Sequence, residues 1–111
     1  MDKLTLYRQH IQSILTYHCQ IDPIGEAMET YTIFDTIGDH YQVVSVGWED
    51  GFRMYGCLIH VDIKDGKIWI QYDGTEYSIA NELIDFGVPK QDIVLAYHAP
   101  YARKYTEFAV S

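Results

Sequence analysis

Positive charge is scarce in this 111-residue chain. Eight lysines and arginines oppose sixteen carboxylates, which gives a formal net charge of −8. No lysine or arginine occurs between Arg8 and Arg53. Nucleic-acid binding relies on clustered cations that displace the counterions of the phosphates, so direct DNA binding is disfavoured. The acidity by itself favours solubility.

Cysteine and long apolar runs are also scarce. Cys19 and Cys57 are the only cysteines, too few for a disulfide framework and without the CxxC spacing of zinc or redox sites. No apolar run approaches the roughly 20 residues that a membrane-spanning helix needs. The first ten residues alternate charged and apolar side chains, whereas a signal peptide carries an unbroken apolar segment. We therefore expect one cytoplasmic domain over residues 1–111, with no membrane association.

Alternating apolar sequence is abundant, most clearly around Asp65-Gly66. Asp-Gly is typical of a two-residue type I′ turn, in which both residues take positive φ. Asp50-Gly51 repeats the signal. The patterns predict antiparallel strands over residues 29–35, 41–49, 52–63 and 67–73. Counting outward from the two turns pairs apolar with apolar residues and predicts one core face, made of Val44, Val46, Tyr55, Cys57, Ile59, Val61, Ile63, Ile68, Ile70 and Tyr72.

Helical spacing occurs on both sides of these strands. Apolar residues at three- and four-residue steps predict a helix over about residues 3–19. A second helix begins near Ile79, capped by Asp73, Thr75 or Ser78, and ends at Gly87. Residues 93–97 predict a fifth strand, 101–105 a helical turn and 106–110 a short further strand. We predict an α+β fold of two layers, an antiparallel four-to-six-stranded meander sheet with two helices packed on one face.

The sheet face away from the helices is the main candidate for a functional surface. It would combine large apolar side chains with polar ones, which is unusual for a solvated sheet face. We expect it to meet another subunit or a partner protein, unless the C-terminal segment folds back over it. The predicted interface residues are Tyr41, Val43, Met54, Leu58, His60, Asp62, Trp69 and Gln71. A second candidate is the basic and aromatic cluster of Tyr101, Arg103, Lys104 and Tyr105, for which a protein interface is favoured over base stacking.

Catalytic chemistry has little support in the sequence. No serine lies in a GxSxG elbow, and the glycine-rich phosphate motifs are absent. His60 and Asp62 project from one strand face and could supply two metal ligands, but a third ligand, such as His98 or Asp73, would have to come near. We therefore assign no catalytic residue, no metal ligand and no cofactor. The competing hypothesis is a ligand-binding or metal-dependent enzyme domain that uses His60 and Asp62.

Three long segments of the chain resemble the XisI family, the fdxN-element excision controlling factors of cyanobacteria. They are DHYQVVSVGW at residues 39–48, YGCLIHVDIKDGKIWIQYDGTE at 55–76 and IANELIDFGVPKQDIVLAYH at 79–98, and residues 100–101 and 105–110 also match. The chain departs from the family pattern at Ile37-Gly38 and Tyr77-Ser78, which concerns turn and helix-start geometry.

The resemblance implies a role in programmed excision of a DNA element during heterocyst development. In that setting the family acts beside a separate recombinase and a second controlling factor, XisH. The resemblance supplies no catalytic residues. We therefore expect a non-catalytic controlling factor that binds an XisH-like protein and forms a homo-oligomer.

Overall fold

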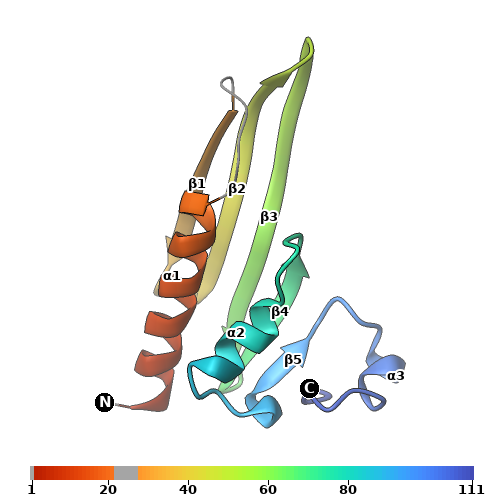
Figure 1. The fold of residues 1–111 in the computed structure, drawn as a ribbon. Coiled ribbons are helices and arrows are strands. Elements are labelled where there is room, and N and C mark those ends of the chain that lie inside the picture. The colour runs from red at the N-terminus through yellow and green to blue at the C-terminus, as the bar shows by residue number, and fades with distance from the viewer. Residues whose placement is uncertain (1, 22–27) are drawn as a thin grey trace.

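The computed structural model describes residues 2–21 and 28–111, which form helices packed on a five-stranded sheet (Figure 1). The elements in chain order are α1 (Lys3–Ile21), β1 (Met28–Asp35), β2 (His40–Glu49), β3 (Phe52–Lys64), β4 (Lys67–Asp73), α2 (Ile79–Asp85), the 3-10 turn η1 (Lys90–Asp92), β5 (Ile93–Leu95) and α3 (Pro100–Arg103). The predicted α+β class is confirmed. Each of the first four strands begins and ends within one residue of its predicted position.

The strands lie in the order β1-β2-β3-β4-β5, and the first four are antiparallel. Both Asp-Gly turns have positive φ at each residue, for example 54° at Asp65 and 76° at Gly66, as a type I′ turn requires. β5 is parallel to β4, because α2 and η1 return the chain before β5 begins. The predicted strand over residues 106–110 is reduced to one parallel bridge between Val94 and Ala109.

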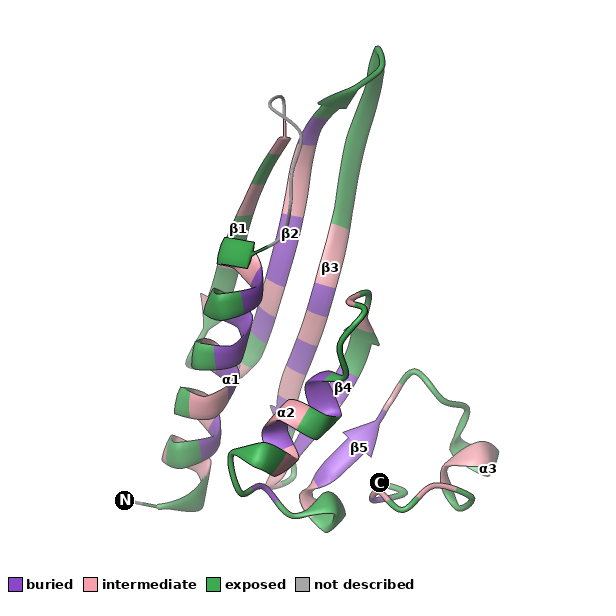
Figure 2. Cartoon of the chain, in the orientation of Figure 1, coloured by how far each residue is buried: buried purple, intermediate pink, exposed green. Residues whose placement is uncertain are grey.

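α1 and α2 cover one face of the sheet, and the core lies beneath them (Figures 1 and 2). The apolar positions of α1 recur at helical spacing, so they form one stripe that packs against β-branched residues of the central strands. Fully buried members of this core include Ile11, Leu15, Ile59, Val61, Ile68, Ile70 and Leu83. In the described part of the chain, no helix is long and apolar enough to cross a membrane.

The start of α2 uses two of the three predicted caps. Ser78 is the N-cap residue, and its hydroxyl oxygen accepts a hydrogen bond from the Asn81 amide at 3.2 Å. The Asp73 carboxylate accepts another from the Ile79 amide at 3.0 Å. These bonds satisfy amide groups that the first turn of a helix leaves without backbone partners.

Two irregularities in the pairing of β3 alter the predicted register. Counting from Asp50-Gly51 correctly places Val44 opposite Cys57, but Val43 then lies opposite Ile59, so Leu58 is an extra residue in β3. Counting from Asp65-Gly66 is likewise correct only near the turn. Beyond a second shift in β4, Tyr72 lies opposite His60, and its predicted pairing with Ile59 is wrong.

The extra residue in β3 corrects the predicted assignment of faces. Tyr41 and Val43, predicted for the interface, are 0% exposed and belong to the core beneath the helices. Leu58 is half-buried and packs against the same core. Tyr55, predicted for the core, is exposed. Tyr72, also predicted for the core, is exposed as well and lies beyond the separate extra residue Gln71 in β4. The physical reason is that side chains alternate between faces, so one extra residue exchanges the faces of the strand beyond it.

Candidate functional site

The sheet face opposite the helices, called the outer face here, carries the main candidate residues. Because Tyr41 and Val43 face the core, their neighbours His40 and Gln42 point to the outer face. Cross-strand pairing then assigns the other members, since residues directly opposite one another share a face. The polar members are His40, Gln42, His60 and Asp62, and the apolar ones include Tyr31, Ile33, Val44, Val46, Trp48, Tyr55 and Trp69. In the described pairing of β3 with β4, Gln71 has no cross-strand partner, but its hydrogen bond to Asp62 places it on the same face.

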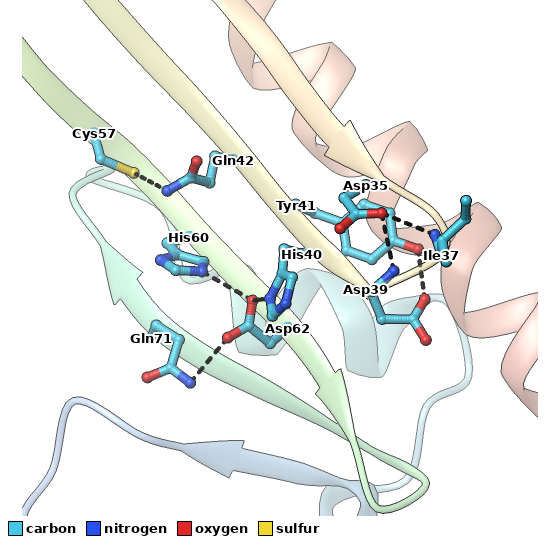
Figure 3. A network of polar contacts seen from close by, with 11 residues as sticks. Asp35, Ile37, Asp39, His40, Tyr41, Gln42, Cys57, His60, Asp62 and Gln71 are labelled. Atoms are coloured by element: carbon cyan, nitrogen blue, oxygen red, sulfur yellow. Dashed lines mark hydrogen bonds and ion pairs between the residues drawn. The ribbon is translucent and has the colours of Figure 1, made fainter.

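Asp62 is the centre of a polar cluster on the outer face (Figure 3). Its Oδ1 atom lies 2.9 Å from His40 Nδ1 and 2.8 Å from His60 Nε2. Its Oδ2 atom accepts a hydrogen bond of 3.2 Å from the Gln71 side-chain amide. Adjacent strands thus direct two imidazoles at one oxygen of a single carboxylate, and we call His40, His60 and Asp62 the histidine–aspartate cluster.

The cluster lies at the surface with its carboxylate shielded. The Asp62 side chain is 15% exposed, whereas the His40 side chain is 59% exposed. The hydrogen bond to Asp62 is the largest cause that raises the pKa of His40 above its ordinary value, and Coulomb attraction to the same carboxylate reinforces it. A cation is therefore stabilised beside Asp62.

The bulge at Leu58 assembles this cluster, and sequence reasoning missed its consequence. Without the extra residue, His40 would lie opposite Val61; with it, His40 lies opposite Asp62. The sequence did hold a signal. Shifting β2 by one residue against β3 pairs apolar with apolar side chains and polar with polar ones, as in Val43 with Ile59.

The two side chains proposed from spacing as a third ligand lie elsewhere. Asp73 caps α2 and also accepts a hydrogen bond from the Thr75 amide at 3.0 Å. The His98 ring packs against Tyr97, with ring centroids 4.7 Å apart. In the described part of the chain, His40 is the third member of the group that His60 and Asp62 form.

Trp69 is partly covered by cations. Its indole Nε1 donates a hydrogen bond to the Lys64 carbonyl at 3.1 Å, and the Lys64 ammonium lies 4.3 Å from the ring centroid. The Arg103 guanidinium lies 5.6 Å from the same ring. The C-terminal segment thus reaches the outer face at Trp69.

Arg103 is also bonded within the C-terminal segment. Its guanidinium donates to the carbonyls of Ala96 and His98 at 3.3 and 3.0 Å. These bonds occupy donors that a phosphate contact would need. The other members of the second candidate cluster, Tyr101, Lys104 and Tyr105, are exposed.

An apolar surface also extends along β1, β2 and β3. The hairpin of β2 and β3 projects past the two helices, and its tip is exposed (Figure 2). Met54, a predicted interface residue, lies in this hairpin and is exposed. On the outer face, four large exposed side chains form what we call the arm surface: Tyr31, Ile33, Trp48 and Tyr55.

The comparison with known proteins supplies the family. The family model described as XisI protein matches residues 1–110. The structure is similar to that of an XisI-like protein from Anabaena variabilis ATCC 29413, with 44% identity, a TM-score of 0.94 and coverage of 98% of this chain and 100% of that one. It is also similar to the fdxN element excision controlling factor XisI from the same strain, with 35% identity, a TM-score of 0.87 and coverage of 99% and 100%. No match was found among curated proteins. The two similarities confirm the resemblance indicated by the sequence.

Proposed function

The chain belongs to the XisI family, and from this premise we propose that it is a non-catalytic controlling factor of DNA-element excision that acts by binding proteins. The relative with 35% identity is named an fdxN element excision controlling factor. The partner that the family implies is an XisH-like protein. We place this binding in the cytoplasm.

The arm surface supports a protein-binding role most directly. Exposed apolar patches on a folded domain mark interaction sites, and aromatic residues are enriched in protein interfaces. Tyr55 is 79% exposed and Trp48 is also exposed, although both stand on paired strands that hold them in place. A rigid aromatic surface loses little conformational entropy on binding, so it can contribute affinity efficiently.

The charge around the arm surface indicates the chemistry of its partner. β1 and β2 contain no lysine or arginine, and Glu29, Glu49 and Asp50 lie on or beside them. Arg53 of β3 lies opposite Trp48, with its guanidinium 5.6 Å from the centroid of that ring. Complementary potentials steer association and fix orientation. The expected partner surface therefore has an apolar centre and a basic rim.

Self-association has a different candidate surface, the free edge of β1. Among the described residues, β1 pairs with β2 alone, which leaves backbone groups on its other side available for pairing. Edge strands are commonly protected by lysine or proline, and β1 contains neither. A second copy could add its own β1 there in antiparallel orientation and extend the sheet across a two-fold axis.

A mixing experiment tests partner binding. The chain would be combined with an XisH protein and analysed by size exclusion with light scattering. We expect a complex of defined mass that Tyr55→Lys weakens by tenfold or more, because the change buries an uncompensated charge. Tyr105→Lys makes the same change in the second candidate cluster, where Tyr105 is 80% exposed, and so compares the two candidate surfaces. No complex, or equal weakening by both variants, would contradict the proposed role of the arm surface.

The same instrument tests self-association with the chain alone. The apparent mass should rise with protein concentration, and Thr32→Lys should lower it towards the monomer, because a lysine on β1 opposes edge pairing and Thr32 lies outside the arm surface. A monomer mass that does not change with concentration would contradict self-association through β1. That result would not bear on partner binding, which the mixing experiment tests.

Excision itself is measured in cells. A strain that lacks its own XisI would receive this chain or the Tyr55→Lys variant, and excision of the element would be scored by amplification across the junction. The unaltered chain should restore excision and the variant should not. Full restoration by the variant would show that excision control does not depend on the arm surface.

A further inference from the structure

We propose that His40, His60 and Asp62 form a binding site for a divalent transition-metal ion, with Zn²⁺ as the expected occupant. The three residues come from adjacent antiparallel strands and meet on the outer face (Figure 3). This inference is independent of the proposed protein-binding role, because the cluster shares no residue with the arm surface.

The spacing of the candidate ligand atoms suits a metal ion. One ligand atom from each residue lies within 4.8 Å of the other two. Zinc bonds of about 2.0–2.1 Å at tetrahedral angles place neighbouring ligand atoms about 3.3 Å apart. Asp62 Oδ1 is 2.9 Å from His40 Nδ1 and 2.8 Å from His60 Nε2. Separations of this size need to open by only about 0.5 Å to admit an ion.

The donor set favours one class of metal. Ca²⁺ and Mg²⁺ take oxygen ligands, whereas imidazole suits zinc, copper, nickel and iron. Two imidazoles with one carboxylate are a common set of three protein ligands for Zn²⁺, and they leave a fourth position open. The open position would hold water or a donor from a docked molecule.

The surrounding structure holds the three ligands in place. His60 and Asp62 are alternate residues of β3, so their side chains project from the same face. His40 lies directly opposite Asp62, and the Gln71 amide holds Asp62 Oδ2 while Oδ1 faces the imidazoles. Such a hydrogen bond to a ligating carboxylate commonly fixes its orientation and supports metal affinity.

The local charge also attracts a cation. Asp35 lies directly opposite His40 and adds negative charge beside the site, whereas the charge of Asp39 is paired with Arg8. Imidazole binds a metal ion through an unprotonated nitrogen, so the ion competes with protons for His40 and His60. Binding should therefore release protons and weaken as the pH falls.

Calorimetric titration of the tag-free chain with Zn²⁺ tests the site. We expect one ion per chain, and Co²⁺ in its place should give the visible absorption of a low-symmetry cobalt complex with nitrogen ligands. His40→Ala and His60→Ala should each weaken Zn²⁺ binding by at least about a hundredfold. Mutating a residue that only hydrogen-bonds to a metal ligand already lowers the affinity by about 10–100-fold, and loss of a ligand should cost more. Gln71→Ala should weaken binding about tenfold. His98→Ala is the matched control and should leave the affinity unchanged.

Two results would overturn the site: no saturable binding by the unaltered chain, or an affinity that is the same in His40→Ala and in the unaltered chain. Thermal unfolding of each variant checks that the fold is retained. His40 is the decisive position because its side chain is 59% exposed, so its removal leaves the core intact.

Discussion

At the residue scale, Asp39 connects α1 to the start of β2. The Arg8 guanidinium donates to both oxygens of the Asp39 carboxylate, at 2.8 and 3.1 Å, and the Tyr41 hydroxyl donates to Asp39 Oδ1 at 2.8 Å. The hydrogen bond from Arg8 is the largest cause that lowers the pKa of Asp39 below its ordinary value of 3.8. A lowered pKa in the folded state means that the ionised carboxylate stabilises the fold.

Asp39→Asn should therefore show a pH-dependent loss of stability. Above the unfolded pKa of about 3.9 the ionised carboxylate contributes fully, and this contribution is lost as the pH falls through the lower folded pKa. The variant should be less stable than the unaltered chain at neutral pH, and the difference should shrink below about pH 4. Asparagine tolerates the φ of 62° at this position. Urea unfolding across this range measures the difference; a pH-independent gap would contradict the assignment.

A buried histidine joins the two helices. His18 of α1 is a buried polar residue of the core, and its Nε2 atom lies 2.6 Å from the Glu82 carboxylate of α2. Glu82→Ala would leave that buried nitrogen without this partner, which should lower the free energy of unfolding by about 1–3 kcal/mol. Asp85→Ala, on an exposed position of the same helix, should change it by no more than about 0.5 kcal/mol. Urea unfolding compares the two, and equal effects would argue against the pair.

At the element scale, the two Asp-Gly hairpins and the bulge between them determine which face of the sheet each side chain of β3 occupies. Each turn fixes the register of the strands next to it. The register that the Asp50-Gly51 turn sets between β2 and β3 changes by one residue at Leu58, which forms a bulge in β3. Towards the Asp50-Gly51 turn β3 contributes Tyr55 to the arm surface, and towards the Asp65-Gly66 turn it contributes Ile59 to the core.

Glycine substitutions distinguish the turn from the strand. Gly66 has a φ of 76°, so Gly66→Ala should destabilise the fold by roughly 1–2 kcal/mol, the cost of a left-handed conformation for an L-residue. Gly56 lies within β3, and a Cβ there would meet no described atom within 4 Å. Gly56→Ala should therefore be neutral or stabilise by up to about 1 kcal/mol. Thermal unfolding measures both, and a larger loss at Gly56 would contradict this account of the hairpin.

At the scale of the whole molecule, the net charge of −8 disfavours DNA binding and is compatible with protein binding. Lysines and arginines are sparse, and Arg103 is engaged by backbone carbonyls and by the Trp69 ring. A surface of this kind releases few counterions from a duplex, so it gains little of the electrostatic free energy that non-specific DNA binding requires.

Fluorescence anisotropy with labelled duplex DNA tests this consequence. At about 50 mM salt, where electrostatic binding is strong, we expect no saturation at micromolar protein. The XisH protein can then be added to the same sample, which shows whether DNA binding arises only in the complex. Tight binding by the chain alone, falling steeply with salt, would contradict the protein-binding reading.

The sequence by itself determined the elements and the fold class. The signals that located the elements act locally: helical and alternating periodicities, two Asp-Gly turns, and the glycine at position 87 that ends the second helix. They placed α1, α2 and four strands to within two residues. The family could also be identified from long matching segments. Each of these signals is contained in residues that are near one another in the chain.

Only the tertiary structure decided which face each residue occupies. The β2–β3 register set by the Asp50-Gly51 turn shifts by one residue at Leu58, where Tyr41 and Val43 of β2 join the core beneath the helices. That choice buried Tyr41 and Val43, exposed Tyr55 and brought His40 to Asp62. Local periodicity cannot specify such a choice, because a one-residue shift preserves the alternation of each strand while exchanging its faces.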